Sequence, residues 1–260
     1  MSEDRLSFAV IIPVYNGADF IQRAIESCLL QTALPDEIIV IDDASNDDTA
    51  GVIRSLNSDL IKYECNKTKR GPSFCRNRGM ELASTSWFLF LDADDIFHPN
   101  KIEIVRYQLT RKKDIFILGH SFDLIGGTRL DITNEWKQLQ MKNMAVKSVL
   151  MKNPAVTPSL AVFAGNKVRF NEEMVYAEDH DFILRTTEQF GFWYLDMPLC
   201  SLQRLPLTPG GISDNKWKMR KGEMSMYMDY CKRHHKYLSM PFLLLFSLMK
   251  HIKNTVISVL

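Results

Sequence analysis

Residues 87–95 constrain the fold of this chain most, because an apolar run there ends abruptly in acidic residues. Residues 87–91 are apolar, and Asp92, Asp94 and Asp95 follow. Such a run is typical of a strand buried on both faces of a sheet. Carboxylates this close repel one another, and a divalent cation such as Mg²⁺ or Mn²⁺ would offset their charge. The stretch predicts a strand ending in a site for a cation and a phosphate-bearing ligand, or else an Asp-rich turn.

Three further stretches typical of strands precede this one, and each is followed by a helical pattern. We expect strands at 8–12, 37–41 and 60–64 and helices at 18–31, through 52–56 and around 75–83, with Asp19 capping the first helix. This alternation predicts an α/β fold with a doubly wound parallel sheet. In such sheets, ligands bind beyond the carboxyl ends of the strands.

Polar residues follow three of these strands where each one ends. Tyr15 and Asn16 follow the first, Asp42 and Asp43 the second, and the acidic residues from Asp92 the fourth. We expect them to meet at one edge of the sheet. Neither a Gly-x-Gly-x-x-Gly motif nor a P-loop follows the first strand, so a bound diphosphate would need a cation.

The bulk composition fits a soluble domain and excludes several classes of protein. The 260 residues are 46% apolar, which is ordinary for a globular domain. Their net charge of +1 gives no electrostatic field that would attract nucleic acid. The five cysteines are scattered without a Cys-x-x-Cys pair, which argues against a disulfide framework or a zinc site and for a reducing compartment. We expect neither a signal peptide nor a membrane-spanning helix.

The second half is less regular. We expect a helix at 101–110, a strand at 114–119, a hairpin at 120–131, a helix at 136–151, a strand at 159–163 and a helix from about 178 to 190. The acidic cluster of Glu178, Asp179 and Asp181 is, on its own, typical of a helix N-terminus.

The C-terminal tail changes in character. Residues 232–236 are basic, residues 240–249 are largely apolar, and Lys250, His251 and Lys253 follow. This pattern fits an interfacial helix on an anionic membrane. A helix that packs in the core or in a dimer is the open alternative.

Five motifs in order, across residues 7–185, resemble those of the family 2 glycosyltransferases. They are residues 10–16, residues 39–47, Arg76-Asn77-x-Gly79, residues 91–95 and Glu178-Asp179-x-Asp181. The resemblance implies a GT-A fold, in which a Rossmann-like sheet of mixed strand order is flanked by helices. We therefore expect a nucleotide-sugar-binding half (1–110), an acceptor-binding and catalytic half (111–215) and a C-terminal helical tail (216–260), for which membrane contact and packing in the core or a dimer both stay open.

The resemblance also implies roles for individual residues in donor binding. Pro13, Tyr15 and Asn16 would line the nucleoside, with Tyr15 stacked on the base. Asp43 would hydrogen-bond the base, while Asp42 would support it or reach the ribose. Arg76 would lie near the nucleotide.

The remaining implied roles concern the metal, the diphosphate and the catalytic base. Asp94 would be the principal ligand of Mn²⁺ or Mg²⁺, and Asp92 would face the ribose or the metal. Asp179 would take the proton from the acceptor hydroxyl. Glu178 and Asp181 are expected to support or cap, and His180 to be a surface or helix residue that is not needed as a base.

Arg204 fits the arginine that many non-processive members carry in this region. It would pair with phosphate or form a surface salt bridge. Pro206 stands where those members have His, and residues 211–213 fit their Ser-x-Ser pattern only in part. The Gln-x-x-Arg-Trp motif of processive members is absent, which predicts transfer of one sugar per acceptor.

Together these implications predict an inverting, metal-dependent glycosyltransferase. The expected donor is a UDP-sugar and the expected acceptor is a hydroxyl of a glycan or lipid-linked saccharide, in bacterial O-antigen, lipopolysaccharide or other polysaccharide biosynthesis. The enzyme would lie in the cytoplasm, peripherally on the inner membrane. The oligomeric state is left open. The alternatives are an inert nucleotide- or glycan-binding module and a nucleotidyltransferase, which would need a basic Gly-rich loop after the first strand.

Overall fold

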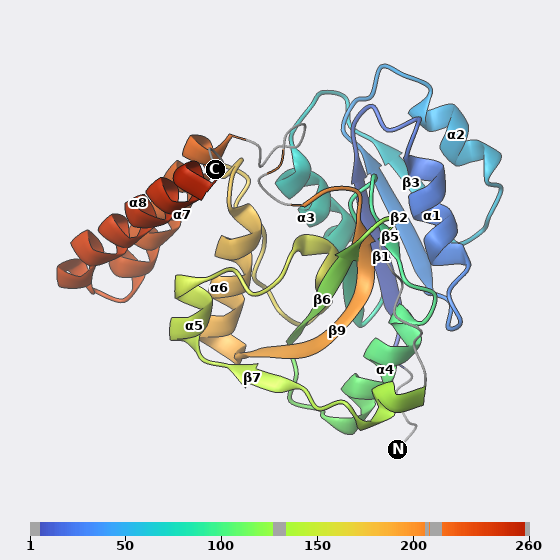
Figure 1. Ribbon diagram of the computed structural model, residues 1–260. Coiled ribbons are helices and arrows are strands. Elements are labelled where there is room, and N and C mark those ends of the chain that lie inside the picture. Colours follow the sequence, from blue (N-terminus) through green and yellow to red (C-terminus); the bar gives the residue numbers. More distant parts are fainter. Residues whose placement is uncertain (1–5, 127–133, 206–207, 209–214, 258–260) are drawn as a thin grey trace.

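The computed structural model describes residues 6–126, 134–205, 208 and 215–257, and its centre is a nine-stranded mixed sheet with helices on both faces (Figure 1). The strand order is β3-β2-β1-β4-β8-β6-β9-β5, and β7 pairs with β9. The strands are β1 Phe8–Val14, β2 Glu37–Asp42, β3 Ile61–Cys65, β4 Trp87–Phe90, β5 Ile96–Phe97, β6 Ile117–Leu124, β7 Lys142–Met144, β8 Leu160–Phe163 and β9 Phe192–Leu202.

Helices of two kinds complete the described chain. The α-helices are α1 Ile21–Leu29, α2 Thr49–Ser55, α3 Pro72–Leu82, α4 Lys101–Arg111, α5 Val146–Met151, α6 Glu178–Phe190, α7 Lys216–Arg233 and α8 Met240–Ile257. The 3₁₀ helices are η1 Asn134–Gln138, η2 Thr157–Ser159 and η4 Tyr237–Ser239. Within the described part of the chain, no helix is both long and apolar enough to cross a membrane.

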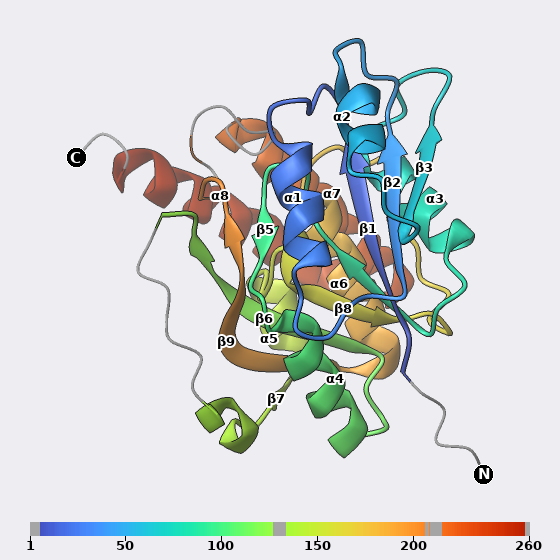
Figure 2. The ribbon, with the colours of Figure 1, turned by 90° about the vertical axis from the view of Figure 1, so that its right-hand side faces the viewer.

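The first four strands form the parallel half of the sheet, as predicted. β1 pairs in parallel with both β2 and β4, and β2 pairs with β3. Successive side chains of β1 pack into two hydrophobic cores on opposite faces of the sheet, because side chains alternate across a strand. Val10 and Ile12 pack with α1, α2 and α4, whereas Ala9 and Ile11 belong to the core that includes α3, α6 and α7 (Figure 2). This three-layer arrangement confirms the predicted fold class.

The second half of the sheet is where sequence patterns failed. β8 runs antiparallel to β4 and β6, so the sheet is mixed from β4 onward. The strands β5 and β9 were not predicted. β9 was missed because its burial is irregular, with Asp196 exposed in the middle and Leu199 to Leu202 buried. It is nevertheless the strand to which β5, β6 and β7 all pair.

Two local predictions were wrong, and a third is only partly described. The expected helix at 136–151 is divided into η1, β7 and α5, because the backbone of β7 pairs with β9. The first part of the expected hairpin at 120–131 is the end of β6, which stops at Leu124; residues 127–131 lie outside the described part, so the hairpin stays a prediction. Asp19 does not cap α1, which begins at Ile21 after Phe20 without a side-chain cap.

All five cysteines are described, and all are free thiols. Cys65, at the end of β3, is exposed, whereas the other four are buried. Burial raises the pKa of the Cys28, Cys75 and Cys200 thiols to about 12.

Gly79 allows α3 to pack closely against β1, and its replacement provides a test of this contact. A Cβ at this position would overlap with Cγ2 of the buried Ile11. We expect Gly79→Ala to lower the free energy of unfolding by about 1–3 kcal/mol, as overpacking does. Urea denaturation measures the change.

The matched control is Gly51→Ala in α2. There a new Cβ would meet only the exposed side chain of Asp48, which can move away. Because alanine has the higher helix propensity, this variant should be as stable as the wild type or more so. Equal destabilisation in both variants would contradict the packing role of Gly79.

Candidate active site

The carboxyl ends of β1 and β2 are held together by their loops. Asn16 and Ala44 both have left-handed backbones, with φ of 51° and 64°, so the chain turns sharply after each strand. The Asn16 N–H donates to Ser45 Oγ at 2.8 Å, and the Asn46 N–H donates to Asn16 Oδ1 at 2.9 Å. Asn16 therefore joins the two loops that follow the strands.

Asp42 supports this edge from inside. It is buried at the end of β2, where its carboxylate accepts hydrogen bonds from Tyr63 Oη at 2.7 Å and from the Ser45 N–H at 2.8 Å. These bonds fix the loop rather than reaching outward. A role for Asp42 beside the base or at the ribose stays a prediction.

Asp43 holds the loop that leads into α3. Its Oδ1 accepts from Asn66 Nδ2 at 2.9 Å and from the Arg70 N–H at 2.7 Å, and its Oδ2 accepts from the Gly71 N–H at 2.7 Å. A carboxylate has about four lone-pair sites, so three bonds leave room for one more. Asp43 is buried and serves as the anchor of residues 66–71.

Tyr15 lies beside this anchored loop. Its side chain is 42% exposed, and the Lys69 ammonium lies 3.3 Å from the centroid of its ring. Pro13, two residues before Tyr15, lies opposite Ile41 of β2 in the sheet. The aromatic ring predicted to stack on a base thus has a cation over one face.

Three carboxylates crowd the end of β4, as predicted, but each has a different partner. Asp92 pairs with Arg76 at 2.8 Å, and Asp94 pairs with Arg204 at 3.4 Å. Asp95 turns inward, where its Oδ1 accepts from the Gln203 N–H at 2.8 Å. Burial and the neighbouring Asp92 raise the pKa of Asp94, and the same causes raise the pKa of Asp95 to about 8.

Arg76 connects this acidic edge to the other half of the molecule. Its guanidinium, only 4% exposed, pairs with Asp92 at 2.8 Å and with Glu178 at 3.2 Å. These carboxylates, together with Asp179, raise the Arg76 pKa despite burial. Burial and the nearby Asp179 raise the pKa of Glu178 to about 7. One buried cation therefore joins α3, the end of β4 and the start of α6.

Asp179 lies in the first turn of α6, directly after a left-handed turn at Ala177, whose φ is 59°. Its Oδ1 accepts from the His180 N–H at 2.7 Å, and its Oδ2 accepts from Asn153 Nδ2 at 2.9 Å. The Asn153 bond comes from the segment after α5, so two separate segments orient this carboxylate.

The neighbours of Asp179 have structural partners. Asp181 is buried and pairs with Arg185 at 2.7 Å, as a supporting group should. His180 lies on the helix as predicted, but not at the surface: it is 4% exposed, and its Nε2–H donates to the Val149 carbonyl at 2.6 Å. Burial lowers its pKa, which keeps the ring neutral.

The carboxylate oxygens at the end of β4 suit a divalent cation that takes the rest of its ligands from water and phosphate. Among the described residues, no group of three or more His, Cys, Asp or Glu side chains is arranged to hold a metal. Asp92 and Asp94 still offer hard oxygen donors on side chains that are each 34% exposed. Mg²⁺ and Mn²⁺ are commonly held by two carboxylates, with water and phosphate oxygens completing the shell. The residues present fit such a site.

The structure thus collects the predicted residues along one edge. Asp43 anchors the loop before α3, and Arg76 lies one turn into that helix. Asp92, Glu178 and Asp179 all act on the Arg76 pKa. Arg204 joins through Asp94, whereas Pro206 and residues 211–213 lie outside the described part. Asn153 and Lys69 were missed, because a lone Asn and a lone Lys in loops carry no sequence pattern.

Known proteins resemble this chain in sequence. Residues 9–166 match the profile described as "Glycosyl transferase family 2". An Escherichia coli protein named "UDP-Glc:alpha-D-GlcNAc-diphosphoundecaprenol beta-1,3-glucosyltransferase WfgD" is 26% identical over 224 residues, 85% of each chain. A Rickettsia felis uncharacterized glycosyltransferase is 42% identical over 96 residues, which are 37% of this chain and 16% of that protein.

Two solved structures share the fold. S. aureus TarS 1-349 in complex with UDP-GlcNAc has a TM-score of 0.70 and 19% identity, covering 95% of this chain and 73% of that one. The mannosyltransferase PcManGT from Pyrobaculum calidifontis, in complex with GDP-Man and Mn²⁺, has a TM-score of 0.65 and 16% identity, covering 95% and 74%.

The two arginines of α3 provide a test of the buried ion network. Removing the Arg76 charge leaves Asp92 and Glu178 without their shared cation. We expect Arg76→Gln to lower the free energy of unfolding by about 3–5 kcal/mol, the usual cost of breaking a buried ion pair. The measurement is urea denaturation at neutral pH.

Arg78→Gln is the matched control, two residues along the same helix. Its guanidinium pairs with Glu64 and Glu81 but is 36% exposed. Solvent screening limits such pairs to about 0–1 kcal/mol. Comparable losses from both substitutions would show that burial of Arg76 has no special effect.

Proposed function

The chain belongs to glycosyl transferase family 2, and from this membership we propose that it moves one sugar from a UDP-sugar to an acceptor hydroxyl with inversion. The observation that carries the proposal is the Arg76 bridge between Asp92 and Glu178, beside Asp179. It brings the residues proposed for donor binding next to the residue proposed as catalytic base. An inert binding module would have no need of that arrangement.

The nucleoside is proposed to lie over the ends of β1 and β2. Tyr15 would stack on the base, with Pro13 and Asn16 beside it. Asp43 has lone-pair capacity left for one bond to the base, and Asp42 keeps its loop in place. The names of TarS bound to UDP-GlcNAc and of the E. coli UDP-Glc-dependent relative support UDP as the nucleotide.

The diphosphate is proposed to lie at the end of β4. Asp94 and Asp92 would hold Mn²⁺ or Mg²⁺, which supplies positive charge against the leaving nucleoside diphosphate. The Mn²⁺ bound by PcManGT supports this choice. Arg204, which is 37% exposed, can exchange its contact with Asp94 for a phosphate oxygen. Arg76 remains buried and holds Asp92 in position.

Asp179 is proposed as the general base. In a single displacement, the acceptor oxygen attacks the anomeric carbon as its proton passes to a carboxylate and the C–O bond to the diphosphate breaks. Asn153 and the His180 N–H bind one oxygen each, which fixes the carboxylate and leaves further lone pairs for the incoming hydroxyl.

The acceptor is proposed to be a glycan or lipid-linked saccharide of a bacterial surface polysaccharide, such as O-antigen or lipopolysaccharide. The E. coli relative, whose name includes a diphosphoundecaprenol acceptor, supports this class. The enzyme would act from the cytoplasmic face of the membrane, adding one sugar per acceptor. Residues 1–110 would bind the donor, residues 111–215 the acceptor, and residues 216–260 would contact the membrane.

Replacing Asp179 by Asn tests the base. The substitution preserves the shape and removes the proton acceptor, so we expect transfer to fall about 10²–10⁴-fold while donor affinity stays near that of the wild type. Incorporation of labelled donor sugar into a bacterial lipid extract measures transfer, and calorimetry measures donor affinity.

Asp181→Asn is the matched control on the same helical turn. Its carboxylate pairs with Arg185 and has no bond to Asn153. The folded variant should keep transfer within a few-fold of the wild type. Undiminished transfer by Asp179→Asn, or equal loss in both, would remove Asp179 as the base.

Metal addition tests the site at the end of β4. A ligand that binds the folded state raises the melting temperature, so UDP should stabilise the wild type more with Mn²⁺ than with a chelator. Asp94→Ala should lose that metal-dependent increment in a thermal-shift assay. Asp196→Ala removes an exposed carboxylate from β9 and should keep it. An increment that survives Asp94→Ala would point to another set of ligands.

A further inference from the structure

The last two helices form a hairpin beyond α6 whose outer face is unusually apolar (Figure 1). Leu238 is 91% exposed and Phe242 75% exposed, and the exposed series continues along α8. From Phe242 onward they recur at intervals of three or four residues, so they form one stripe on α8, which Leu238 in η4 precedes. The stripe, counting Leu238 as its first member, consists of Leu238, Phe242, Leu245, Met249 and Ile252.

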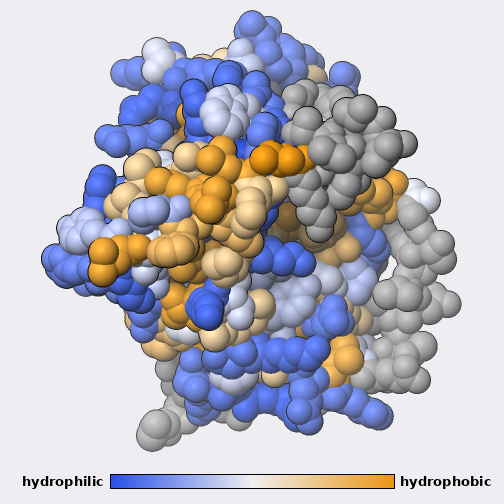
Figure 3. Space-filling model, turned by 60° about the vertical axis from the view of Figure 1, so that its left-hand side comes forward, coloured by the Kyte–Doolittle hydropathy of each residue, from blue (hydrophilic) through white to orange (hydrophobic). Residues whose placement is uncertain are grey.

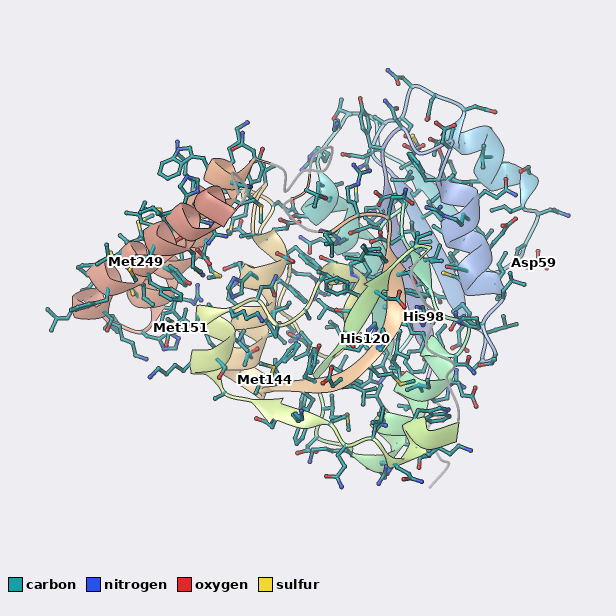
Figure 4. All side chains as sticks on the ribbon, in the orientation of Figure 1. Asp59, His98, His120, Met144, Met151 and Met249 are labelled. Carbon is teal, nitrogen blue, oxygen red and sulfur yellow. The ribbon has the colours of Figure 1, made fainter. Side chains whose placement is uncertain are left out.

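The other side of α8 is fixed to the protein, so the stripe cannot turn inward. Leu243 and Ser247 are buried, and Ser247 Oγ donates to the Glu223 carboxylate of α7. Lys250 Nζ also donates to Glu223, and it reaches the Met151 carbonyl at 3.3 Å. Figure 4 shows Met249 on α8 and Met151 on α5 at the same end of the molecule. The exposed stripe is therefore a feature of the folded state.

The segment that carries this apolar face is rich in basic residues. Residues 216–260 contain nine Lys and Arg but only two acidic side chains, although the whole chain has a net charge of +1. The exposed run from Lys232 to Lys236 lies directly before the exposed Tyr237 and Leu238. Figure 3 shows hydrophobic residues gathered on this face with hydrophilic residues around them. An apolar stripe with a basic rim suits insertion among anionic lipid headgroups.

We propose that the outer face of α8, with the basic turn at 232–236, is a docking surface for an anionic lipid bilayer. A second copy of the chain is the other plausible occupant of an apolar stripe. Two such segments would bring their excess positive charges together, and that repulsion disfavours pairing. A bilayer surface of opposite charge gains from both features.

This inference rests on the proposed function, because docking on a bilayer would bring a lipid-linked acceptor near Asp179, the proposed base. α7 packs on the segment before α6 so closely that a Cβ on Gly222 would overlap with the Tyr176 carbonyl. Lys250 binds the carbonyl of Met151, two residues before Asn153, which holds Asp179. A bilayer bound at α8 would therefore lie at a fixed position relative to the proposed base.

Vesicle flotation at low salt tests the surface. The wild type should float with vesicles that contain phosphatidylglycerol, bind pure phosphatidylcholine vesicles weakly, and be released at high salt. Phe242→Ser/Leu245→Ser should lower partitioning by at least about tenfold, since two exposed apolar side chains are lost. Because both positions are exposed, the fold should persist, and circular dichroism checks it.

Leu30→Ser/Leu34→Ser is the matched control, with two side chains that are 74% and 50% exposed near the end of α1. It should float like the wild type. No flotation of the wild type, or equal flotation of the α8 variant, would overturn the proposal. So would a wild-type dimer in sedimentation that the α8 variant loses, since a second copy would then occupy the stripe.

The readout requires neither donor nor acceptor, so it is independent of catalysis. Asp179→Asn should bind vesicles as the wild type does. If the protein transfers sugar but does not bind vesicles, only the docking-surface proposal is overturned. If it binds vesicles but transfers no sugar, only the proposed activity is overturned.

Discussion

A single buried guanidinium holds the proposed active site together. Arg76 lies on a helix of the nucleotide half and pairs with one carboxylate at the end of β4 and another at the start of α6. A buried charge of this kind is stable only while its partners are present, so the two halves of the molecule must keep their relative position. The same cation offsets negative charge in a region where acidic groups raise one another's pKa.

The mixed sheet explains how distant segments reach that cation. β4 pairs in parallel with β1 and antiparallel with β8, so it is the border between a regular α/β half and an irregular half. Its carboxyl end has the loops of β1 and β2 on one side and, on the other, the segments before β8 and after β9. In the proposed function, the first half would bind the donor while groups of the second half reach the reacting bond.

Sequence patterns predicted the first half well because β1, β2 and β4 are buried on both faces and each is a nearly continuous apolar run. Residues 37–41 and 87–91 are examples. β9 could not be found in this way, because its burial varies with its several partners. The site followed the same division. Asp92 and Asp94 were predicted from their place at a strand end, but their arginine partners depend on tertiary packing. The Asn153 contact with Asp179 joins residues 26 positions apart and leaves no local signal.

The distribution of thiols has a practical consequence. Cys65 is the exposed member of the five, while burial keeps the Cys28, Cys75 and Cys200 thiols protonated and unreactive. The next residue, Asn66, donates to Asp43 in the loop proposed to meet the nucleotide base. A fluorophore coupled to the native protein would therefore attach at one position, beside the loop whose rearrangement it could report. The fluorescence of a label at Cys65 would follow ligand exchange in real time.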